Sequence, residues 1–527
     1  MSDHNGGVRR LSALFVSIII VAASCSSLPD SDLASGDASS TTSSSSSTQA
    51  GGDGQDGATS TTAANTTSTE TTSTTAAVTT TSRRSSAELV LGGETVGDPY
   101  YPTIGNTGYD VSHYTLDLTI DIDATDMILG LATIDFDATA DIDGLSFDFT
   151  GLTVTSANIG GAPAEFEQAN DKLRLRFDEM LPEGSQHSVE IAYEGNPTTL
   201  TSGTRIGPIG WYDQPAASVA IGEPFGARAW YPVNDHPTDK ATYTFRLNVR
   251  DGLVGVANGV LDSQETFADR TITTWNMNQP MASYLATVTV GDYVILDADD
   301  FGDTEVVDAV PSRIEDVAPG DFDQTDEMLE VFTELFGPYP FDEYGVMVID
   351  AEFGFALETQ GRSIFSAQLV DGDGSIERIV AHELAHQWFG NSVSPATWQD
   401  IWLNEGFASY AEDLWLEFGR GQNINQLETR LVERALGSPT PAPGNPGAAG
   451  LFDPSVYRRG GLTLHALRVD VGDEVFFDIL REWTNRFGGG TASTADFVAL
   501  SEELSGANLD AFFAGWLGGG PVPPLTS

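Results

Sequence analysis

Two histidines and two glutamates in the second half of the chain have the types and spacing of a metal site. His382 and His386 are four residues apart, so on a helix both imidazoles point the same way and can reach one ion. Glu383 follows the first histidine directly, where its carboxylate could take a proton from a metal-bound water. Glu405, separated from His386 by eighteen residues, could supply a third ligand. Three protein ligands leave a fourth position open for water, as in catalytic and not in structural zinc sites.

The flanking residues predict two helices that would carry these side chains. Residues 376–389 have apolar residues at helical spacing, with no proline or glycine before Gly390. Gly390 and Pro395 then indicate a stop and a turn, and a second helical pattern begins near Trp398 and contains Glu405. We therefore expect Glu405 on a separate helix that packs antiparallel to the first. The alternative is a chance motif with purely structural histidine and glutamate side chains.

The rest of the chain predicts an α+β, multidomain protein. From residue 109 to 294 apolar and polar residues alternate, with glycine, asparagine and aspartate at the turns, which predicts an antiparallel β-sandwich or saddle. The aspartates of these strands alternate and do not gather in one loop, so we interpret them as a solvated face and not as calcium ligands. After Val306 the periodicity becomes helical, with an amphipathic helix expected over residues 323–336. Further helices are expected over residues 464–471, 474–487 and 496–517.

Composition divides the chain into four segments. Residues 1–25 read as a signal peptide, because a basic start precedes an apolar run too short for a membrane span. Residues 26–95 are rich in serine and threonine and cannot bury enough surface to fold, so we expect a disordered linker. A β domain is predicted over residues 96–298 and a catalytic domain over residues 299–527.

The only cysteine, Cys25, stands where a lipoprotein signal would place its acylated residue. We expect a lipid anchor there; the alternative is ordinary cleavage after a small-residue site, with Cys25 incidental. The protein would then face the outside of the cell on its membrane, or be secreted if Cys25 is not acylated. With no second cysteine, the exported fold must hold without an intrachain disulfide.

The net charge of −53 excludes nucleic acids and anionic lipid headgroups as partners, since both would be repelled. Lys172 and Lys240 are the only lysines, and every other basic residue is arginine. Two interpretations remain open: an acidic surface adapted to a saline environment, or the codon bias of a GC-rich genome.

Several segments, in order along the chain, resemble the aminopeptidase N family of gluzincins. Residues 382–410 are similar to its zinc core, in which HExxH, eighteen residues and a glutamate follow each other. Residues 98–114, 223–237 and 282–293 resemble stretches of its N-terminal β domain. The resemblance implies a β domain followed by a thermolysin-like, mainly helical catalytic domain with one Zn²⁺ per chain.

The resemblance also implies two carboxylates that bind the free amine of a peptide. Glu358 resembles the glutamate of the family's G-x-M-E-N segment, although Phe355, Leu357 and Thr359 stand where Gly, Met and Asn are usual. These departures put the backbone contacts and the shape of the first side-chain pocket in doubt. Glu223 aligns with a second amine-binding position, contributed by the β domain. A cationic amine needs such acids close to the metal but not bound to it.

Tyr457 resembles the tyrosine of the family's Y-E-K-G segment, which donates a hydrogen bond to the developing oxyanion. Arg458 and Arg459 replace the Glu and Lys that usually follow it, so the local electrostatics differ. His465, on an apolar helical pattern, is interpreted as structural.

The function that follows is an extracytoplasmic zinc aminopeptidase acting on peptides with a free N-terminus. The alternatives are a zinc endopeptidase of the same fold and a catalytically silent, lipid-anchored binding protein. Larger relatives carry a further helical domain over the active site that has no counterpart in this sequence, so we expect a less covered cleft.

Overall fold

The computed structural model describes residues 92–122, 127–214, 216–298, 300–351 and 353–525. The predicted signal peptide, Cys25 and nearly all of the predicted linker lie outside the described residues, and the domain boundaries stay predictions. Among the described residues, no helix is long and apolar enough to cross a membrane.

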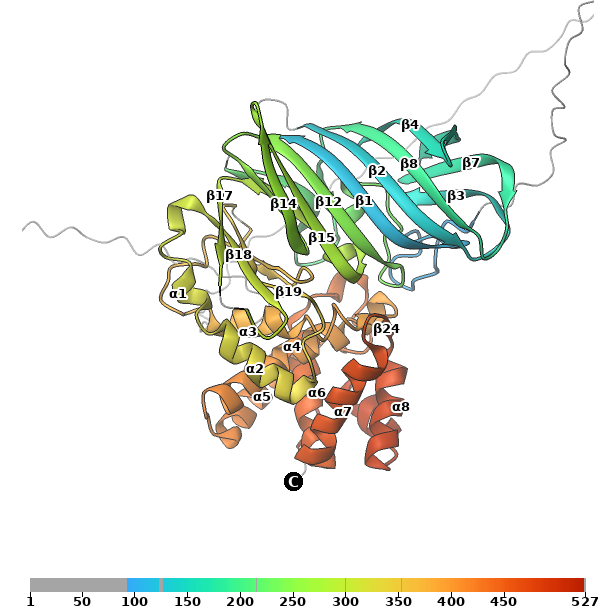
Figure 1. Cartoon of the computed structure of the whole chain (residues 1–527). Helices are drawn as coiled ribbons and strands as arrows, with labels where there is room; N and C mark the ends of the chain where they lie inside the picture. Colours follow the sequence, from blue (N-terminus) through green and yellow to red (C-terminus); the bar gives the residue numbers. More distant parts are fainter. Residues whose placement is uncertain (1–91, 123–126, 215, 299, 352, 526–527) are drawn as a thin grey trace, which may run out of the picture. The chain divides into compact units, whose positions relative to one another are not determined.

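Three sheets form the β domain. The largest has the strand order β14-β15-β12-β1-β2-β8-β4-β5, and Figure 1 shows most of these strands side by side. The second has the order β13-β16-β11-β10-β9, and the third has the order β3-β7-β6. The strands are β1 (Tyr109–Asp121), β2 (Met127–Ala138), β3 (Ile142–Asp148), β4 (Thr153–Ile159), β5 (Ala162–Pro163), β6 (Glu165–Ala169), β7 (Lys172–Leu181), β8 (Gln186–Gly195), β9 (Thr199–Thr201), β10 (Pro208–Asp213), β11 (Ala217–Ile221), β12 (Lys240–Arg250), β13 (Val254–Ala257), β14 (Val260–Phe267), β15 (Arg270–Ala282) and β16 (Val288–Gly291).

The alternation read from the sequence is visible in β1. Leu116, Leu118 and Ile120 are buried, while the residues between them are partly exposed. Asp117 lies on the partly exposed face and pairs with Arg246 on β12 at 3.3 Å. The aspartates of this strand therefore keep contact with solvent, as expected of a solvated face.

One strand pair departs from the expected antiparallel pattern. β1 pairs with β2 in antiparallel fashion but with β12 in parallel, in register from His113 opposite Thr242 to Thr119 opposite Asn248. Parallel neighbours need a long connection, and the strands β2 to β11 supply it. Local periodicity predicts strands but not the direction in which distant strands pair.

The catalytic domain joins a mixed sheet to a group of helices. The sheet has the order β17-β18-β20-β22-β21, with β19 also paired to β18, and a two-stranded sheet joins β23 to β24. β17 falls in the range predicted for the β domain but pairs with β18. The strands are β17 (Tyr293–Asp297), β18 (Glu305–Pro311), β19 (Glu343–Tyr344), β20 (Val346–Ile349), β21 (Ala356–Leu357), β22 (Ser363–Ser366), β23 (Ser394–Pro395) and β24 (Thr491–Ala492).

The helices, drawn in yellow to red in Figure 1, follow the predicted pattern with one extension. The helix predicted over residues 323–336 corresponds to α2. The helix that carries Tyr457 begins at Pro454, earlier than the periodicity suggested, because Asp453 caps it by accepting from the backbone of Ser455. The helices are α1 (Pro319–Phe322), α2 (Thr325–Phe336), α3 (Glu377–Ala385), α4 (Trp402–Leu414), α5 (Ile424–Gly437), α6 (Pro454–Val471), α7 (Asp473–Phe487), α8 (Thr494–Ser505) and α9 (Asp510–Trp516).

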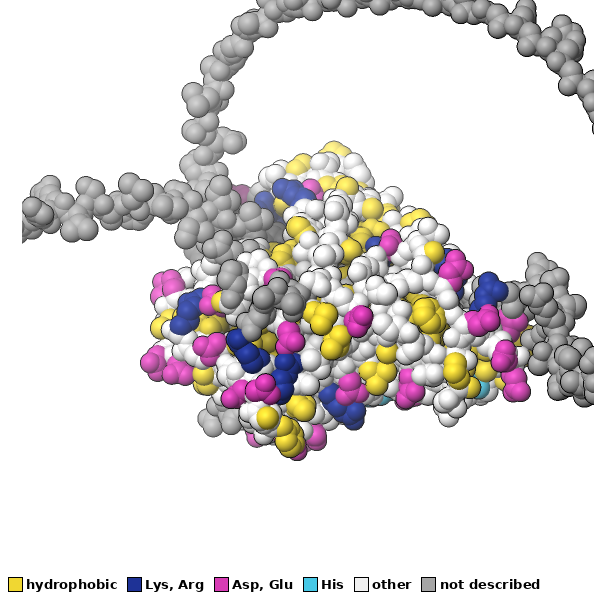
Figure 2. Space-filling view, turned by 90° about the horizontal axis from the view of Figure 1, so that it is seen from above, with side chains coloured by type: hydrophobic (Ala, Val, Ile, Leu, Met, Phe, Trp, Pro, Cys, Tyr) yellow, Lys and Arg dark blue, Asp and Glu magenta, His cyan; other side chains and the backbone are white. Residues whose placement is uncertain are grey.

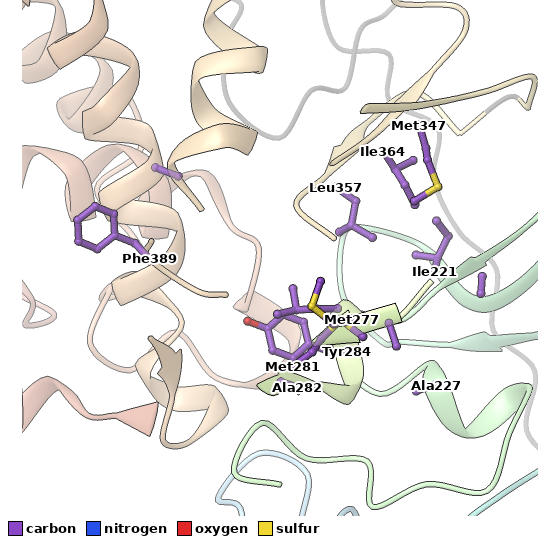
Figure 3. Close-up of a cluster of buried hydrophobic side chains, with 14 of the residues drawn as sticks. Ile221, Ala227, Met277, Met281, Ala282, Tyr284, Met347, Leu357, Ile364 and Phe389 are labelled. Carbon is purple, nitrogen blue, oxygen red and sulfur yellow. The ribbon is translucent and has the colours of Figure 1, made fainter. Parts of the chain in front are cut away.

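Buried apolar side chains of the β domain and the catalytic domain belong to one continuous cluster. Figure 3 shows part of it, with Ile221 and Met277 from β-domain strands and Leu357 and Ile364 from β21 and β22. Lys240 of β12 adds a polar contact, because its Nζ donates to the carbonyls of Asn391 at 2.8 Å and Ser392 at 2.9 Å. The residues that follow α3 are thus held by the β domain.

Acidic side chains are spread over the surface face shown in Figure 2 and do not form a single patch. Both lysines are engaged in internal contacts. Lys172 is buried and lies 2.7 Å from Asp148, and Lys240 binds the two carbonyls described above.

Candidate active site

Helices α3 and α4 bring the three predicted ligands together. His382 lies on α3, His386 caps its C-terminus, and Glu405 lies in the first turn of α4. The Nε2 atoms of His382 and His386 are 3.4 and 3.6 Å from Oε2 of Glu405. All three side chains are buried, and one possible ligand atom from each lies within 4.8 Å of the others. These distances suit three atoms that surround one small cation.

The outer ring nitrogens of the histidines are occupied. Nδ1 of His382 lies 3.0 Å from Oε1 of Glu412, and Nδ1 of His386 lies 3.1 Å from the carbonyl oxygen of Phe389. A carboxylate and a carbonyl oxygen accept hydrogen bonds, so each Nδ1 donates, and Nε2 is the atom of each ring that faces Glu405 and binds a metal ion once it has lost its proton. Two imidazoles whose outer nitrogens are hydrogen-bonded and one carboxylate form a ligand set that fits a zinc ion.

Glu412 was not among the residues predicted from the sequence. It follows Glu405 by two helical turns on α4, a spacing that places both on one face and that could have drawn attention to it. Burial opposes its ionisation, but the hydrogen bond to His382 and the charges of Arg434 and Arg378 hold the pKa of Glu412 at about 2. A charged partner behind His382 increases the basicity of that ligand.

Glu383 lies beside the ligand cluster and is buried. A second set of possible ligand atoms, from Glu358, Glu383 and His386, also lies within 4.8 Å. Burial raises the pKa of Glu383 to about 8, and the charges of His382 and His386 act against this shift. A divalent cation at the cluster would favour the ionised carboxylate, which is the form that accepts a proton.

Glu223 and Glu358 meet at the same place, although they come from different domains. Both side chains are buried, and the pKa of Glu223 is raised by burial and then by the negative charges of Glu358, Glu405 and Glu383. Burial likewise raises the pKa of Glu358. Oε1 of each glutamate has no hydrogen-bond partner among the described residues. Buried carboxylate oxygens without partners are costly, so this pair favours a cationic ligand.

The backbone of Glu358 is held by the residues that follow the second histidine. Its carbonyl oxygen accepts from Gln387 at 3.2 Å and from Asn391 at 2.6 Å. Gln387 also accepts from the backbone N–H of Gly361 at 2.9 Å. The segment that carries Glu358 is thus bound to the residues that directly follow His386.

Tyr457 reaches the cluster from α6. Its ring lies 6.0 Å from that of His382, nearly parallel to it, and burial followed by the charge of Glu405 raises its pKa. Helices α6 and α4 approach closely at Gly460 and Gly406, where a Cβ on Gly406 would lie only 3.0 Å from the backbone of Gly460. Because neither glycine has a side chain, α6 can lie close enough to α4 for Tyr457 to reach the zinc ligands. A protonated phenol beside the ligands can donate a hydrogen bond to an anion.

His465 lies outside this group of residues. It is buried on α6, bonds to the hydroxyl of Tyr410 at 3.1 Å and lies 3.5 Å from Glu428. These contacts agree with its interpretation as a structural residue.

Comparison with known proteins gives one consistent result. Residues 110–285 match the Peptidase M1 N-terminal domain, and residues 321–516 match the Peptidase family M1 domain. The crystal structure of an M1 zinc metallopeptidase from Deinococcus radiodurans aligns with a TM-score of 0.76 and 31% identity, over 82% of this chain and 99% of that one. This chain belongs to the M1 family of zinc metallopeptidases. The family resemblance, the two-part α+β fold and zinc as the cofactor are thereby confirmed.

Two curated M1 relatives are considerably longer. Probable aminopeptidase 2 of Sulfurisphaera tokodaii is 27% identical over 70% of this chain and 49% of its own length. Aminopeptidase M1 of Arabidopsis thaliana is 27% identical over 73% of this chain and 48% of its own length. The chain spans about half the length of these relatives. A mutant form of the Deinococcus enzyme has been crystallised with a Tyr-Ser-Ala substrate, and a two-domain M1 metallopeptidase with L-arginine.

Proposed function

We propose that this M1 protein is a zinc aminopeptidase that removes N-terminal residues from peptides. The observation that carries the proposal is the pair of buried glutamates, Glu223 and Glu358, each with an unpartnered oxygen beside the ligand cluster. A substrate ammonium group would satisfy both carboxylates and fix the first peptide bond near the metal. The names of the curated relatives support the same activity.

Each residue of the site has a separate role in the proposed reaction. His382, His386 and Glu405 would hold the zinc ion, which when bound would lower the pKa of a water molecule and polarise the scissile carbonyl. Glu383 takes a proton as the water attacks the carbonyl carbon, and then returns it to the nitrogen of the leaving amine. The hydroxyl of Tyr457 donates a hydrogen bond to the carbonyl oxygen as negative charge develops there.

The test compares amino-acid arylamides that have a free amine with their N-acetylated forms, with and without a chelator. We expect chelator-sensitive turnover of the free-amine substrates only, because acetylation removes the charge that Glu223 and Glu358 bind. Equal turnover of both forms would instead establish an endopeptidase. A fully zinc-loaded protein that hydrolyses no member of a peptide library would establish a silent binding protein.

We also propose that the protein is exported and held on the outer side of the cell membrane by a lipid on Cys25. The support is the apolar leader, the position of this single cysteine and the Ser/Thr-rich segment that follows it. The full chain should partition into the detergent phase, and the Cys25→Ser variant should partition into the aqueous phase. If both partition alike, the anchor is disproved.

A further inference from the structure

Two adjacent acidic residues on α4 are buried outside the reaction described above. Glu412 is 1% exposed and Asp413 is 2% exposed. Buried carboxylates are tolerated in protein interiors when cations and hydrogen-bond donors compensate them. The groups that compensate this pair lie on two neighbouring helices.

Three arginines, here named the arginine clamp, surround the pair. Arg378 of α3 donates to Oε2 of Glu412 at 2.8 and 3.2 Å and lies 3.5 Å from Asp413. Arg434 of α5 lies 3.4 Å from Asp413 and 3.9 Å from Glu412. Arg430, one turn earlier on α5, lies 3.9 Å from Asp413.

The two oxygens of Glu412 face opposite neighbours. Oε1 accepts from Nδ1 of His382, and Oε2 faces Arg378 and Arg434. A carboxylate bound on one side only could rotate away from the imidazole. The hydrogen bonds from Arg378 oppose this rotation, and the charge of Arg434 lies 3.9 Å from the same oxygen.

We propose that the arginine clamp is a positioning device for the zinc ion. Arg378 holds Glu412 by hydrogen bonds and Arg434 attracts it by its charge, and Glu412 in turn holds His382 so that Nε2 points toward Glu405 and His386. Helix α5 supplies no ligand and no catalytic group, yet through Arg434 it contributes to metal affinity. This inference concerns zinc binding and does not depend on the proposed peptidase activity.

The test measures the zinc dissociation constant by competition with a chromogenic chelator. We expect affinity to fall about 10-fold in Arg378→Gln and Arg434→Gln, since loss of a partner of a metal ligand typically costs 10–100-fold. Arg378→Lys should recover part of the loss, because it keeps the charge but not the planar donor pair. Arg486→Gln, which breaks an exposed ion pair with Glu482 and Glu503, is the matched control and should bind zinc normally.

A double-mutant cycle separates positioning from simple structural support. In the Glu412→Gln background the arginine substitutions should no longer change zinc affinity, because their effect passes through that carboxylate. Melting temperatures of the zinc-free variants provide the second measurement. Zinc affinity within twofold of the wild type, together with a lower melting temperature, would overturn the proposal. So would arginine effects of equal size with and without Glu412.

If the glutamine variants do not fold, Arg378→Lys and Arg434→Lys give the same test. We expect weaker zinc binding that depends on Glu412, and unchanged binding in both would overturn the proposal.

Discussion

The zinc ligands and the two glutamates proposed to bind the substrate amine, Glu223 and Glu358, lie next to each other but differ in how their polar atoms are satisfied. Both outer nitrogens of His382 and His386 are bonded to groups of the catalytic domain. Glu223 and Glu358 come from two domains, and each leaves one oxygen without a partner among the described residues. The first arrangement holds ligand atoms in place before a metal arrives, whereas the second has carboxylate oxygens that a cationic substrate would satisfy under the proposed function. Unsatisfied carboxylate oxygens beside the metal ligands are the observation on which the proposed binding of a substrate amine rests.

The largest expected effect is that of removing the proton acceptor. Glu383→Gln should lower kcat by about 10³-fold, because amide nitrogen and oxygen cannot take the proton of the attacking water. Zinc content should stay at one ion per chain, since Glu383 is not a ligand. Metal analysis and arylamide kinetics on one preparation check both parts. A variant with substantial activity would place the proton acceptor elsewhere.

Removing one amine-binding carboxylate should have the next largest effect. Glu223→Gln and Glu358→Gln should each lower kcat/KM for free-amine arylamides about 10²-fold, because a buried charge loses its partner. Zinc affinity should not change. Glu315→Gln, at an exposed position, is the control. If either variant lost zinc and activity together, that glutamate would belong with the metal ligands and the contrast between the two groups would fail.

The tyrosine tests whether a neutral donor on α6 belongs to the reaction. Tyr457→Phe removes only the hydroxyl and should lower kcat by about 10²-fold with little change in KM, because the hydrogen bond forms as charge develops. Initial rates at saturating and limiting substrate separate the two constants. A change in KM alone would mean that Tyr457 contacts the bound substrate but not the developing anion.

The smallest effect concerns Glu343, a buried carboxylate away from the site. Neither of its oxygens has a hydrogen-bond partner among the described residues, and burial raises its pKa to about 8. Because of this raised pKa, we expect the buried carboxyl group of Glu343 to be neutralised by a proton and not by a bound cation. Its contribution to stability is complete below the unfolded pKa of about 4.3 and is lost as the pH rises through 8.

Glu343→Gln should therefore flatten the fall in melting temperature between pH 5 and pH 8. We expect the variant to gain roughly 5 °C on the wild type across this range. Thermal melts at both pH values measure the difference. Parallel curves for the two proteins would show that Glu343 does not titrate in this range.

Sequence periodicity was enough to place the zinc ligands, because their spacing reports directly on helix geometry. His382, His386 and Glu405 lie on or at the ends of α3 and α4, as the helical patterns suggested. Glu412 was missed because a single glutamate in an acidic sequence does not stand out. Its spacing of seven residues from Glu405 on α4 places both side chains on one face of the helix and was the available signal. The early start of α6 was missed although Asp453 and Pro454 form a common helix beginning.

Tertiary proximity could not be derived from local patterns. Glu223 and Glu358 were identified only through family resemblance, since nothing in their neighbourhoods shows that two domains bring them together. The parallel pairing of β1 with β12 was missed for the same reason. The arginine clamp also joins α3 and α5 through contacts that no spacing along the chain predicts.

The most direct test of the account is a zinc-edge anomalous diffraction map from a crystal soaked with a free amino acid. We predict one anomalous peak about 2.0–2.2 Å from ligand atoms of His382, His386 and Glu405. The ammonium nitrogen of the amino acid should lie about 3 Å from both Glu223 and Glu358. A metal bound instead by Glu358 and Glu383, or an ammonium group distant from both Glu223 and Glu358, would contradict the account.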